Sequence, residues 1–212
     1  MPLLLLIRHA VTETTGKHLP APDVGLSAQG REDAARLAER LRDVPLAAIY
    51  TSPLARSRET AAPLAAAKGL EVRTVEGLRD TEYGTWTGRS LRQIGRTKLW
   101  RALRERPSAV RFPGGETLPE VQARAVRAIE DVVAAHPRGV VALVCHADVV
   151  RLVLMHLIGL HVDFIERFAV APASVSAVLA GVGVPRLLAL GCTGDLGSLA
   201  PRRRPAQRKV GG

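Results

Sequence analysis

The chain has 212 residues, of which 47% are hydrophobic and 24% charged, a composition typical of a single globular domain with a sizeable core. Its two cysteines, Cys145 and Cys192, are too few for a disulfide framework and favour a reducing, cytoplasmic location. The formal net charge of +10 suggests a polyanionic partner, but only 3% of the residues are aromatic, which leaves few platforms for stacking bases.

Much of the positive charge lies in the last stretch of the chain, "PRRRPAQRKVGG". Removing its five basic residues lowers the net charge from +10 to +5. We expect a domain over residues 1–198 and a basic, disordered tail over 199–212 that makes at most weak, nonspecific contacts with polyanions. The apolar segments 3–7 and 151–160 are too short to span a bilayer, so no membrane association is predicted.

The first half of the chain alternates strands with helices. The run 3–7 predicts a buried strand, because it is apolar throughout and does not alternate with polar residues. Residues 26–43 predict a helix with Ser27 as its N-cap and with apolar residues on one face, namely Ala34, Leu37, Ala38 and Leu41. A strand, a helix that ends at Gly69 and a third strand follow, over 47–50, 56–69 and 70–74.

Residues 78–116 interrupt this alternation with the Gly- and Thr-rich "RDTEYGTWTGRS", a helical stretch over 91–104 and the loop "RFPGGET". Thr117 and Glu120 then form a capping box ahead of a helix with Val121, Ala125, Ile129 and Val132 on its buried face. The last predicted elements are a strand, a helix and a hairpin, over 140–145, 147–158 and 174–191. The pattern predicts a three-layer α/β fold, with a mostly parallel central sheet flanked by helices and a small helical and loop insertion at 88–116.

Polar residues follow three of the predicted parallel strands. Arg8 and His9 end the first strand, Arg56 follows the second, and His146 follows the strand over 140–145. Open α/β sheets bind ligands outside the carboxyl ends of their strands, so we expect these four side chains at one crevice. Guanidinium groups match phosphate oxygens bidentately, and the sequence therefore predicts a phosphoryl site. No metal or cofactor motif is present, so neither is expected.

Five motifs, "LIRHA", "TSPLARSRETA", "LRDTEYGTWTG", "FPGGET" and "LVCHADVVR", resemble in order and spacing the histidine phosphatase superfamily, in its phosphoglycerate-mutase-like branch. The resemblance covers roughly residues 3–180. A narrower similarity, carried by "YGTWTGRSL" and "PSAVRFPGGETLPEVQARAV", is to actinobacterial proteins described as phosphomutases or phosphatases. The resemblance implies the phosphoglycerate mutase-like fold.

The resemblance also implies a metal-independent phosphomonoester hydrolase that acts on a small phosphorylated metabolite. His9 would attack phosphorus and form a phosphohistidine. Arg8, Arg56 and His146 would hold the remaining phosphoryl oxygens and offset the charge that grows in the transition state. Because the nucleophile must be neutral, we expect its other ring nitrogen to donate to a backbone carbonyl that fixes the tautomer.

The proton donor is a point at which this sequence departs from the family. The family places a glutamate in the segment that matches "LRDTEYG", and Asp80 occupies that position with a side chain one methylene shorter. Glu82, two residues on, lies on the same side if the segment is extended, and it is the alternative donor. Thr15 stands where the family often has an asparagine that contacts phosphate, and it keeps a hydroxyl donor.

Two further residues are weaker candidates for substrate contact. Gly115 would offer a backbone amide to the pocket, although a simple turn explains it equally well. Arg89 would form part of a substrate rim, although an amphipathic cover helix explains it as well. Cys145, beside His146, is interpreted as a small buried residue at the end of a strand rather than as a nucleophile.

Three functions stay open at this point. The first is hydrolysis, the second is a phosphomutase in which the phosphate returns to a substrate hydroxyl, and the third is a catalytically silent binding module that recruits partners through the basic tail. The modest length of the insertion favours hydrolysis, and the four intact strand-end residues argue against the silent module. The natural substrate and the oligomeric state are also open, with a homodimer among the assemblies considered.

Overall fold

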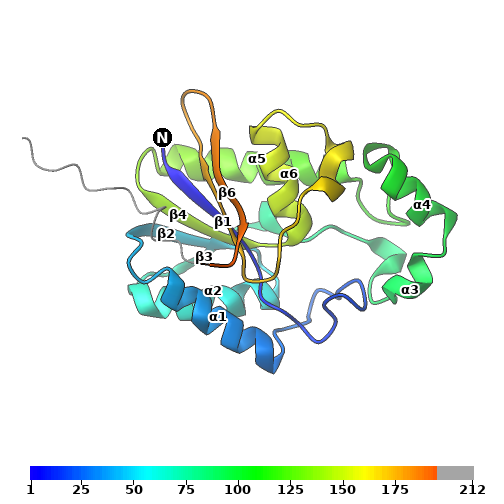
Figure 1. Cartoon of the computed structure of the whole chain (residues 1–212), viewed down its shortest axis with the longest axis horizontal. Helices are drawn as coiled ribbons and strands as arrows, with labels where there is room; N and C mark the ends of the chain where they lie inside the picture. The colour runs from blue at the N-terminus through cyan, green and yellow to red at the C-terminus, as the bar shows by residue number, and fades with distance from the viewer. Residues whose placement is uncertain (195–212) are drawn as a thin grey trace, which may run out of the picture.

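The computed structural model describes residues 1–194, which form helical layers on both faces of a central sheet (Figure 1). The strands are β1 (Leu3–Arg8), β2 (Leu46–Thr51), β3 (Val72–Thr74), β4 (Val140–Cys145), β5 (Val175–Leu179) and β6 (Arg186–Cys192). They are arranged in the order β3-β2-β4-β1-β5-β6, and β3, β2, β4 and β1 are parallel. The predicted fold class is confirmed, whereas the predicted tail at 199–212 and the domain boundary at 198 lie outside the described residues.

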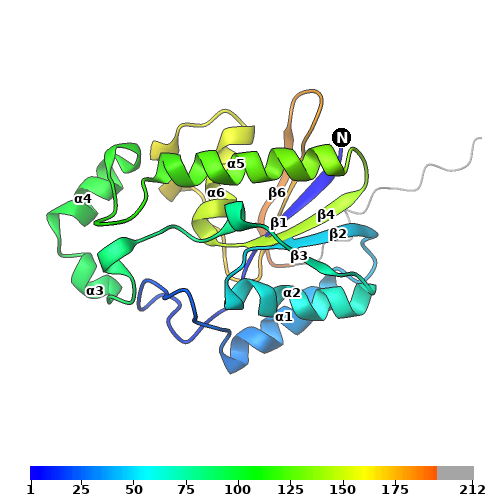
Figure 2. The ribbon, with the colours of Figure 1, turned by 180° about the vertical axis from the view of Figure 1, so that it is seen from behind.

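Two pairs of helices cover the sheet. The helices α1 (Ala28–Arg40) and α2 (Ala55–Lys68) pack together on one face, and α5 (Leu118–Ala135) and α6 (Ala147–Leu157) on the other (Figure 2). The side chain of Ser27 caps α1, and Gly69 ends α2 in the left-handed conformation with φ 62°. The predicted capping box of Thr117 and Glu120 starts α5.

Strand β1 shows why the opening of the chain is apolar throughout. Leu3, Leu5 and Ile7 pack with residues of α1 and α2, while Leu4 and Leu6 pack with residues of α5 and α6. Successive side chains of a strand point to opposite faces, and here both faces are covered. A polar residue in β1 would therefore be buried on either side until the strand ends at Arg8.

The insertion differs from the prediction in its helical part. In place of one helix over 91–104, the structure has α3 (Leu91–Ile94) and α4 (Lys98–Glu105). The break occurs because Thr97 caps α4, its side-chain oxygen accepting a hydrogen bond from the backbone N–H of Trp100, and this requires an extended backbone at Thr97. The insertion projects beyond the end of the sheet (Figure 1).

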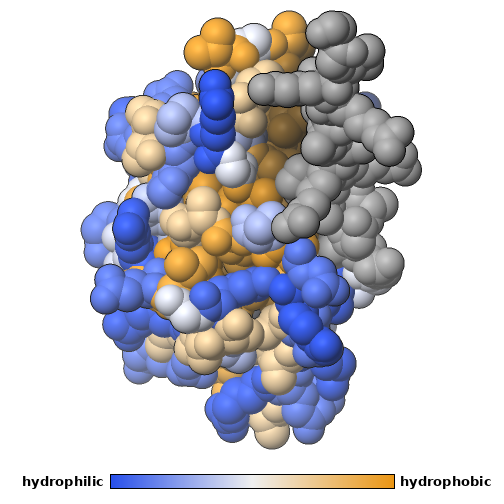
Figure 3. Space-filling model, turned by 90° about the vertical axis from the view of Figure 1, so that its left-hand side faces the viewer, coloured by the Kyte–Doolittle hydropathy of each residue, from blue (hydrophilic) through white to orange (hydrophobic). Residues whose placement is uncertain are grey.

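The predicted hairpin consists of β5, antiparallel to β1, and the edge strand β6. Its tip is apolar and exposed, with Val182 98% and Val184 82% exposed. Figure 3 shows the face turned away from the insertion, on which apolar residues gather. Within residues 1–194, no helix is both long enough and apolar enough to cross a membrane.

Candidate active site

Strand register brings the two predicted histidines together. Arg8, the last residue of β1, pairs with Cys145, the last residue of β4, and the backbone N–H of His9 donates to the carbonyl of Cys145 at 2.8 Å. Neighbouring strands lie about 4.8 Å apart, so the residues that follow two paired strand ends start as neighbours. The ring centroids of His9 and His146 are accordingly 5.2 Å apart.

The imidazole of His9 is buried and held in one tautomer. Its Nδ1 lies 2.7 Å from the carbonyl oxygen of Ala10, and because a carbonyl only accepts, Nδ1 carries the hydrogen and Nε2 has the free lone pair. Burial, reinforced by the nearby His146 and Arg56, lowers the pKa of His9 to about 3. His9 is therefore a neutral base with an available nitrogen at ordinary pH.

Arg56 enters the site from the first turn of α2 and is 1% exposed. Its Nη2 donates to Oδ2 of Asp80 at 2.8 Å, and its Nη1 donates to the carbonyl of Ala21 at 3.1 Å. The Nε of Arg56 is buried without a hydrogen-bond partner among the described residues. A buried donor without a partner is costly, and an anion in the site would satisfy it.

His146 closes the other side of the site as the residue that precedes α6. Its Nε2 lies 2.8 Å from Oγ of Ser52, and its Nδ1 lies 3.3 Å from Oδ2 of Asp80. Burial, followed by the neighbouring cation of Arg56, lowers the pKa of His146 well below its ordinary value. The two imidazoles therefore add no positive charge, which leaves the guanidinium groups as the cations of the site.

Arg8 supplies a second guanidinium at the end of β1. Its Nη1 donates to the carbonyl of Val170 at 2.7 Å, while its Nε is buried without a partner among residues 1–194. Burial and the nearby Arg151 both lower the pKa of Arg8. Buried guanidinium donors without partners, close to two neutral imidazoles, suit a small dianion.

A cavity of about 290 Å³ lies at this site. Its lining includes Arg8, His9, Asp80 and Thr15, so the structure places four of the predicted residues at one space. Oγ1 of Thr15 accepts the backbone N–H of Thr12 at 2.8 Å. Arg56 and His146 do not line this cavity, but both contact Asp80, which does.

Three predicted residues lie elsewhere. The side chain of Glu82 is 64% exposed and lies 3.8 Å from Arg79, outside the cavity lining. The amide of Gly115 donates to the carbonyl of Phe112 at 2.8 Å, so it is committed to a turn. Arg89 borders a separate hollow beside Trp86, and neither Gly115 nor Arg89 lines the cavity at His9.

Two residues of α6 belong to the site and were not predicted. Asp148 and Arg151 both line the cavity, and Nη1 of Arg151 lies 3.4 Å from Oδ1 of Asp148. The hydroxyl of Tyr83 donates to Oδ2 of Asp148 at 3.2 Å, and burial raises the pKa of Asp148. The motif "HADVVR" carried the signal, since residues three apart share a helix face and this helix starts at the site.

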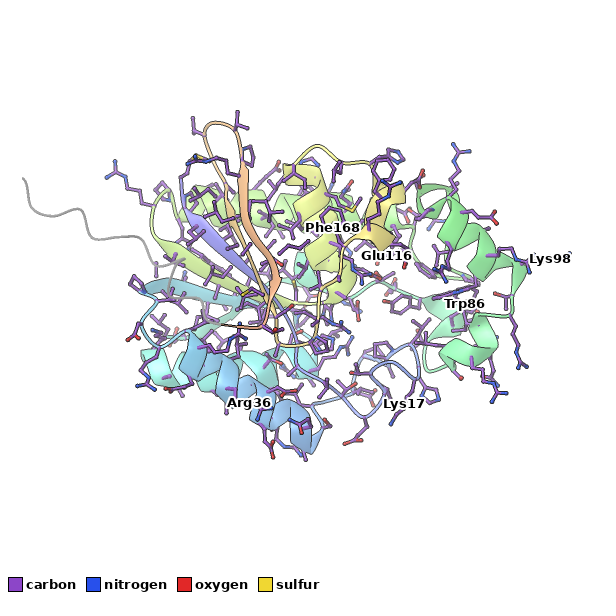
Figure 4. The ribbon with its side chains drawn as sticks, in the orientation of Figure 1. Lys17, Arg36, Trp86, Lys98, Glu116 and Phe168 are labelled. Atoms are coloured by element: carbon purple, nitrogen blue, oxygen red, sulfur yellow. The ribbon has the colours of Figure 1, made fainter. Side chains whose placement is uncertain are left out.

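Arg124 on α5 fixes the segment that carries Asp80. Its Nη1 donates to the carbonyls of Gly77 and Arg79 at 2.9 and 2.8 Å, and its Nη2 donates to the carbonyl of Asp80 at 2.9 Å. Glu116, labelled in Figure 4, pairs with the same guanidinium at 2.7 Å. Within residues 1–194, no group of three or more His, Cys, Asp and Glu side chains is placed to hold a metal ion.

Comparisons with known proteins identify the family of this chain. The model of the histidine phosphatase superfamily (branch 1) matches residues 4–193. Phosphoserine phosphatase 1 of Hydrogenobacter thermophilus is 32% identical over 179 residues, 82% of this chain and 85% of that protein. The glucosyl-3-phosphoglycerate phosphatase of Mycolicibacterium vanbaalenii is 31% identical over 170 residues, 76% of each chain. The structure of a mycobacterial glucosyl-3-phosphoglycerate phosphatase complexed with VO3 has a TM-score of 0.83 at 28% identity, covering 91% of this chain and all of that one.

The chain belongs to branch 1 of the histidine phosphatase superfamily, and it is a phosphatase of the histidine type. The family resemblance carried by the five motifs is therefore confirmed.

Proposed function

We propose that this histidine phosphatase hydrolyses small phosphomonoesters through a phosphohistidine formed on Nε2 of His9. One observation carries the proposal: a buried, neutral imidazole is fixed by its hydrogen bond to Ala10, beside a cavity bordered by cations with unpartnered donors. The printed names of the relatives, a phosphoserine phosphatase and a glucosyl-3-phosphoglycerate phosphatase, support a small phosphorylated metabolite as substrate.

In the first step, Nε2 of His9 forms a bond to phosphorus while the bond from phosphorus to the ester oxygen breaks. The hydrogen bond from Nδ1 to Ala10 stabilises the imidazolium character that develops on the ring. Arg8, which lines the cavity, and Arg56, which contacts Asp80 beside it, each have an unpartnered Nε–H, and we assign both to the phosphoryl oxygens. His146, neutral and beside the nucleophile, serves as a hydrogen-bonding partner rather than as a charge.

Asp80 is the proposed proton donor for the departing alkoxide. In this structure its Oδ2 is held by Arg56, and its Oδ1 accepts the backbone N–H of Thr81 at 3.0 Å. A bound phosphoryl group gives Arg56 a second anionic partner and loosens its hold on Asp80. A monoanionic substrate brings a proton that Asp80 takes up and then passes to the leaving oxygen.

In the second step, a water oxygen bonds to phosphorus and the bond to Nε2 breaks, with the water proton returning to Asp80. If a substrate hydroxyl replaced the water, the same site would act as a mutase. The phosphatase names of the relatives favour water as the acceptor.

The experiment is to incubate the enzyme with a radiolabelled aryl phosphate in excess chelator and to quench in acid or base. We expect continued turnover and a phosphoenzyme that is labile in acid and stable in base. His9→Ala should abolish both signals, and undiminished turnover in that variant would refute the proposal. A parallel assay on 3-phosphoglycerate separates release of phosphate from isomerisation to 2-phosphoglycerate.

A further inference from the structure

The cavity at His9 has an apolar part on the side of the insertion. We define its apolar wall by six residues of the cavity lining, from the insertion, from the start of α5 and from the 3-10 helix Val162–Arg167: Leu91, Trp100, Leu103, Phe112, Leu118 and Ile165. The guanidinium, imidazole and carboxylate groups described above come instead from the strand ends, the segment of Asp80 and α6. The same space therefore joins a charged end to an apolar end.

Helix α4 turns apolar side chains toward this cavity without burying them. Trp100 and Leu103, three residues apart on one helix face, are only partly buried, and no residue of α4 is fully buried. Lys98, at the start of the same helix, lies on the outer side of the insertion (Figure 4). Trp100 and Leu103 pack against the core cluster with one side, and the part of them that stays exposed at the cavity is available to an apolar group of a ligand.

An aromatic cluster supports the apolar wall. Phe112 packs edge-on against Tyr83 and Trp86, with ring centroids 5.1 and 5.9 Å apart, and Trp86 lies 6.3 Å from Trp100. Trp86 and Phe112 are buried, so the partly exposed ring of Trp100 rests on a fixed base. Such a wall is preorganised to pack against another flat, apolar group.

Most of the polar groups near the cavity already have partners. The hydroxyls of Thr14 and Thr15 each lie 3.0 Å from the hydroxyl of Thr12 and are paired within that loop. Nη1 of Arg151 pairs with Asp148, while Nε of Arg151 is buried without a partner among the described residues, and Glu166 adds a further carboxylate to the lining. A second anionic group on the substrate would meet the two carboxylates of Asp148 and Glu166 beside the single guanidinium of Arg151.

We propose that the natural substrate is the phosphomonoester of a compact, apolar alcohol, and that the apolar wall binds its leaving group. The inference rests on the proposed function, since it assigns a leaving group to the same reaction. The volume of about 290 Å³ lies near the lower end of the range for small-molecule pockets, which limits the leaving group to a small ring or a short chain. The substrate then differs from those named for the two relatives, which carry a carboxylate.

The test compares 2-phenylethyl phosphate with O-phosphoserine. Both release a primary alcohol, and the alkoxide of serine is the better leaving group, so chemistry alone does not favour the apolar ester. We expect kcat/KM to be at least about 10-fold higher for 2-phenylethyl phosphate. Leu103→Asn should reduce this ratio about 10-fold and leave inhibition by vanadate unchanged. Leu99→Asn is the matched control, because Leu99 is a partly buried leucine of the same helix that does not line the cavity.

The outcomes separate this inference from the proposed function. If neither ester is hydrolysed and no phosphoenzyme forms, the proposed function fails. If phosphoserine is hydrolysed as well as 2-phenylethyl phosphate or better, only the inference fails. If the ratio of kcat/KM for the two esters is unchanged in Leu103→Asn, the apolar wall does not bind the leaving group and the inference fails. Should that variant not fold, inhibition of the unaltered enzyme by 2-phenylethylphosphonate and by 2-aminoethylphosphonate decides, since equal inhibition overturns the inference.

Discussion

The two sides of the cavity are built in opposite ways. The side at the strand ends is buried and polar, and the register of β1 and β4 holds it in place. The side at the insertion is apolar and partly exposed, and it rests on two short helices outside the sheet. The comparison shows that the sheet positions the residues proposed to react with the phosphoryl group. The proposed binding surface for the leaving group lies instead on the insertion, whose shape does not depend on the sheet.

The largest effect should come from the nucleophile on the strand-end side. His9→Ala removes the atom that bonds to phosphorus, so we expect kcat to fall by about 10⁴-fold or more for every substrate. Single-turnover phosphate release measures this. If the loss of kcat differed between leaving groups, it would contradict the assignment of phosphoryl chemistry to the strand-end side and of leaving-group binding to the insertion.

The next largest effect should come from Asp80, and Glu82 serves as its control. Asp80→Asn should lower kcat by about 10²- to 10³-fold, because the leaving oxygen loses its proton donor. Glu82→Gln should leave kcat within about two-fold, because that side chain faces solvent beside Arg79. The deficit of Asp80→Asn should be smaller for aryl phosphates, whose leaving groups need less protonation. Equal loss in both variants would contradict the assignment.

The buried imidazole of His9 should make the stability of the protein depend on pH. The unfolded chain binds a proton at His9 below about pH 6.5, whereas the folded protein resists protonation there until about pH 3. As the pH is lowered from about 6.5 to about 3, the free energy of unfolding should therefore decrease, by about 1 kcal/mol per pH unit for this histidine. Urea unfolding of the wild type and of His9→Gln, which lacks this group, measures the difference. Parallel pH profiles would contradict a neutral, buried His9.

The smallest effect is expected at Arg89, on the outer surface of the insertion. It borders a hollow separate from the cavity, so Arg89→Ala should change kcat/KM by less than about two-fold for both apolar and polar esters. Steady-state assays with 2-phenylethyl phosphate and O-phosphoserine test this. A selective loss on one ester would extend the apolar side of the site beyond the cavity.

Much of the strand-end side could be predicted, because its signals are local. A run of apolar residues that stops at Arg8 and His9 marks both a buried strand and its carboxyl end, and parallel strands bring such ends together. The capping residues Ser27 and Thr117 act within four residues of their own position and were also predictable. The fold class and the proximity of His9 to His146 could therefore be predicted, whereas the roles of the site residues stay a prediction.

The features that were missed depend on tertiary contacts. The expectation for Glu82 assumed an isolated extended segment, but its backbone N–H and carbonyl bond to Glu116, which turns the side chain outward. The hydrogen bonds of Arg124 go to backbone carbonyls of the segment that carries Asp80, about 45 residues away in the chain. Asp148 and Arg151 looked like ordinary helix residues, because only the placement of α6 brings them to the cavity.

The thiol of Cys145 has a practical consequence. It lies at the end of β4, directly before His146, yet it is fully buried and burial raises its pKa to about 12. Thiolates are the species that peroxides and alkylating agents attack, and almost none forms at this position near neutral pH. Catalysis should therefore persist under oxidative stress that silences phosphatases whose nucleophile is a cysteine.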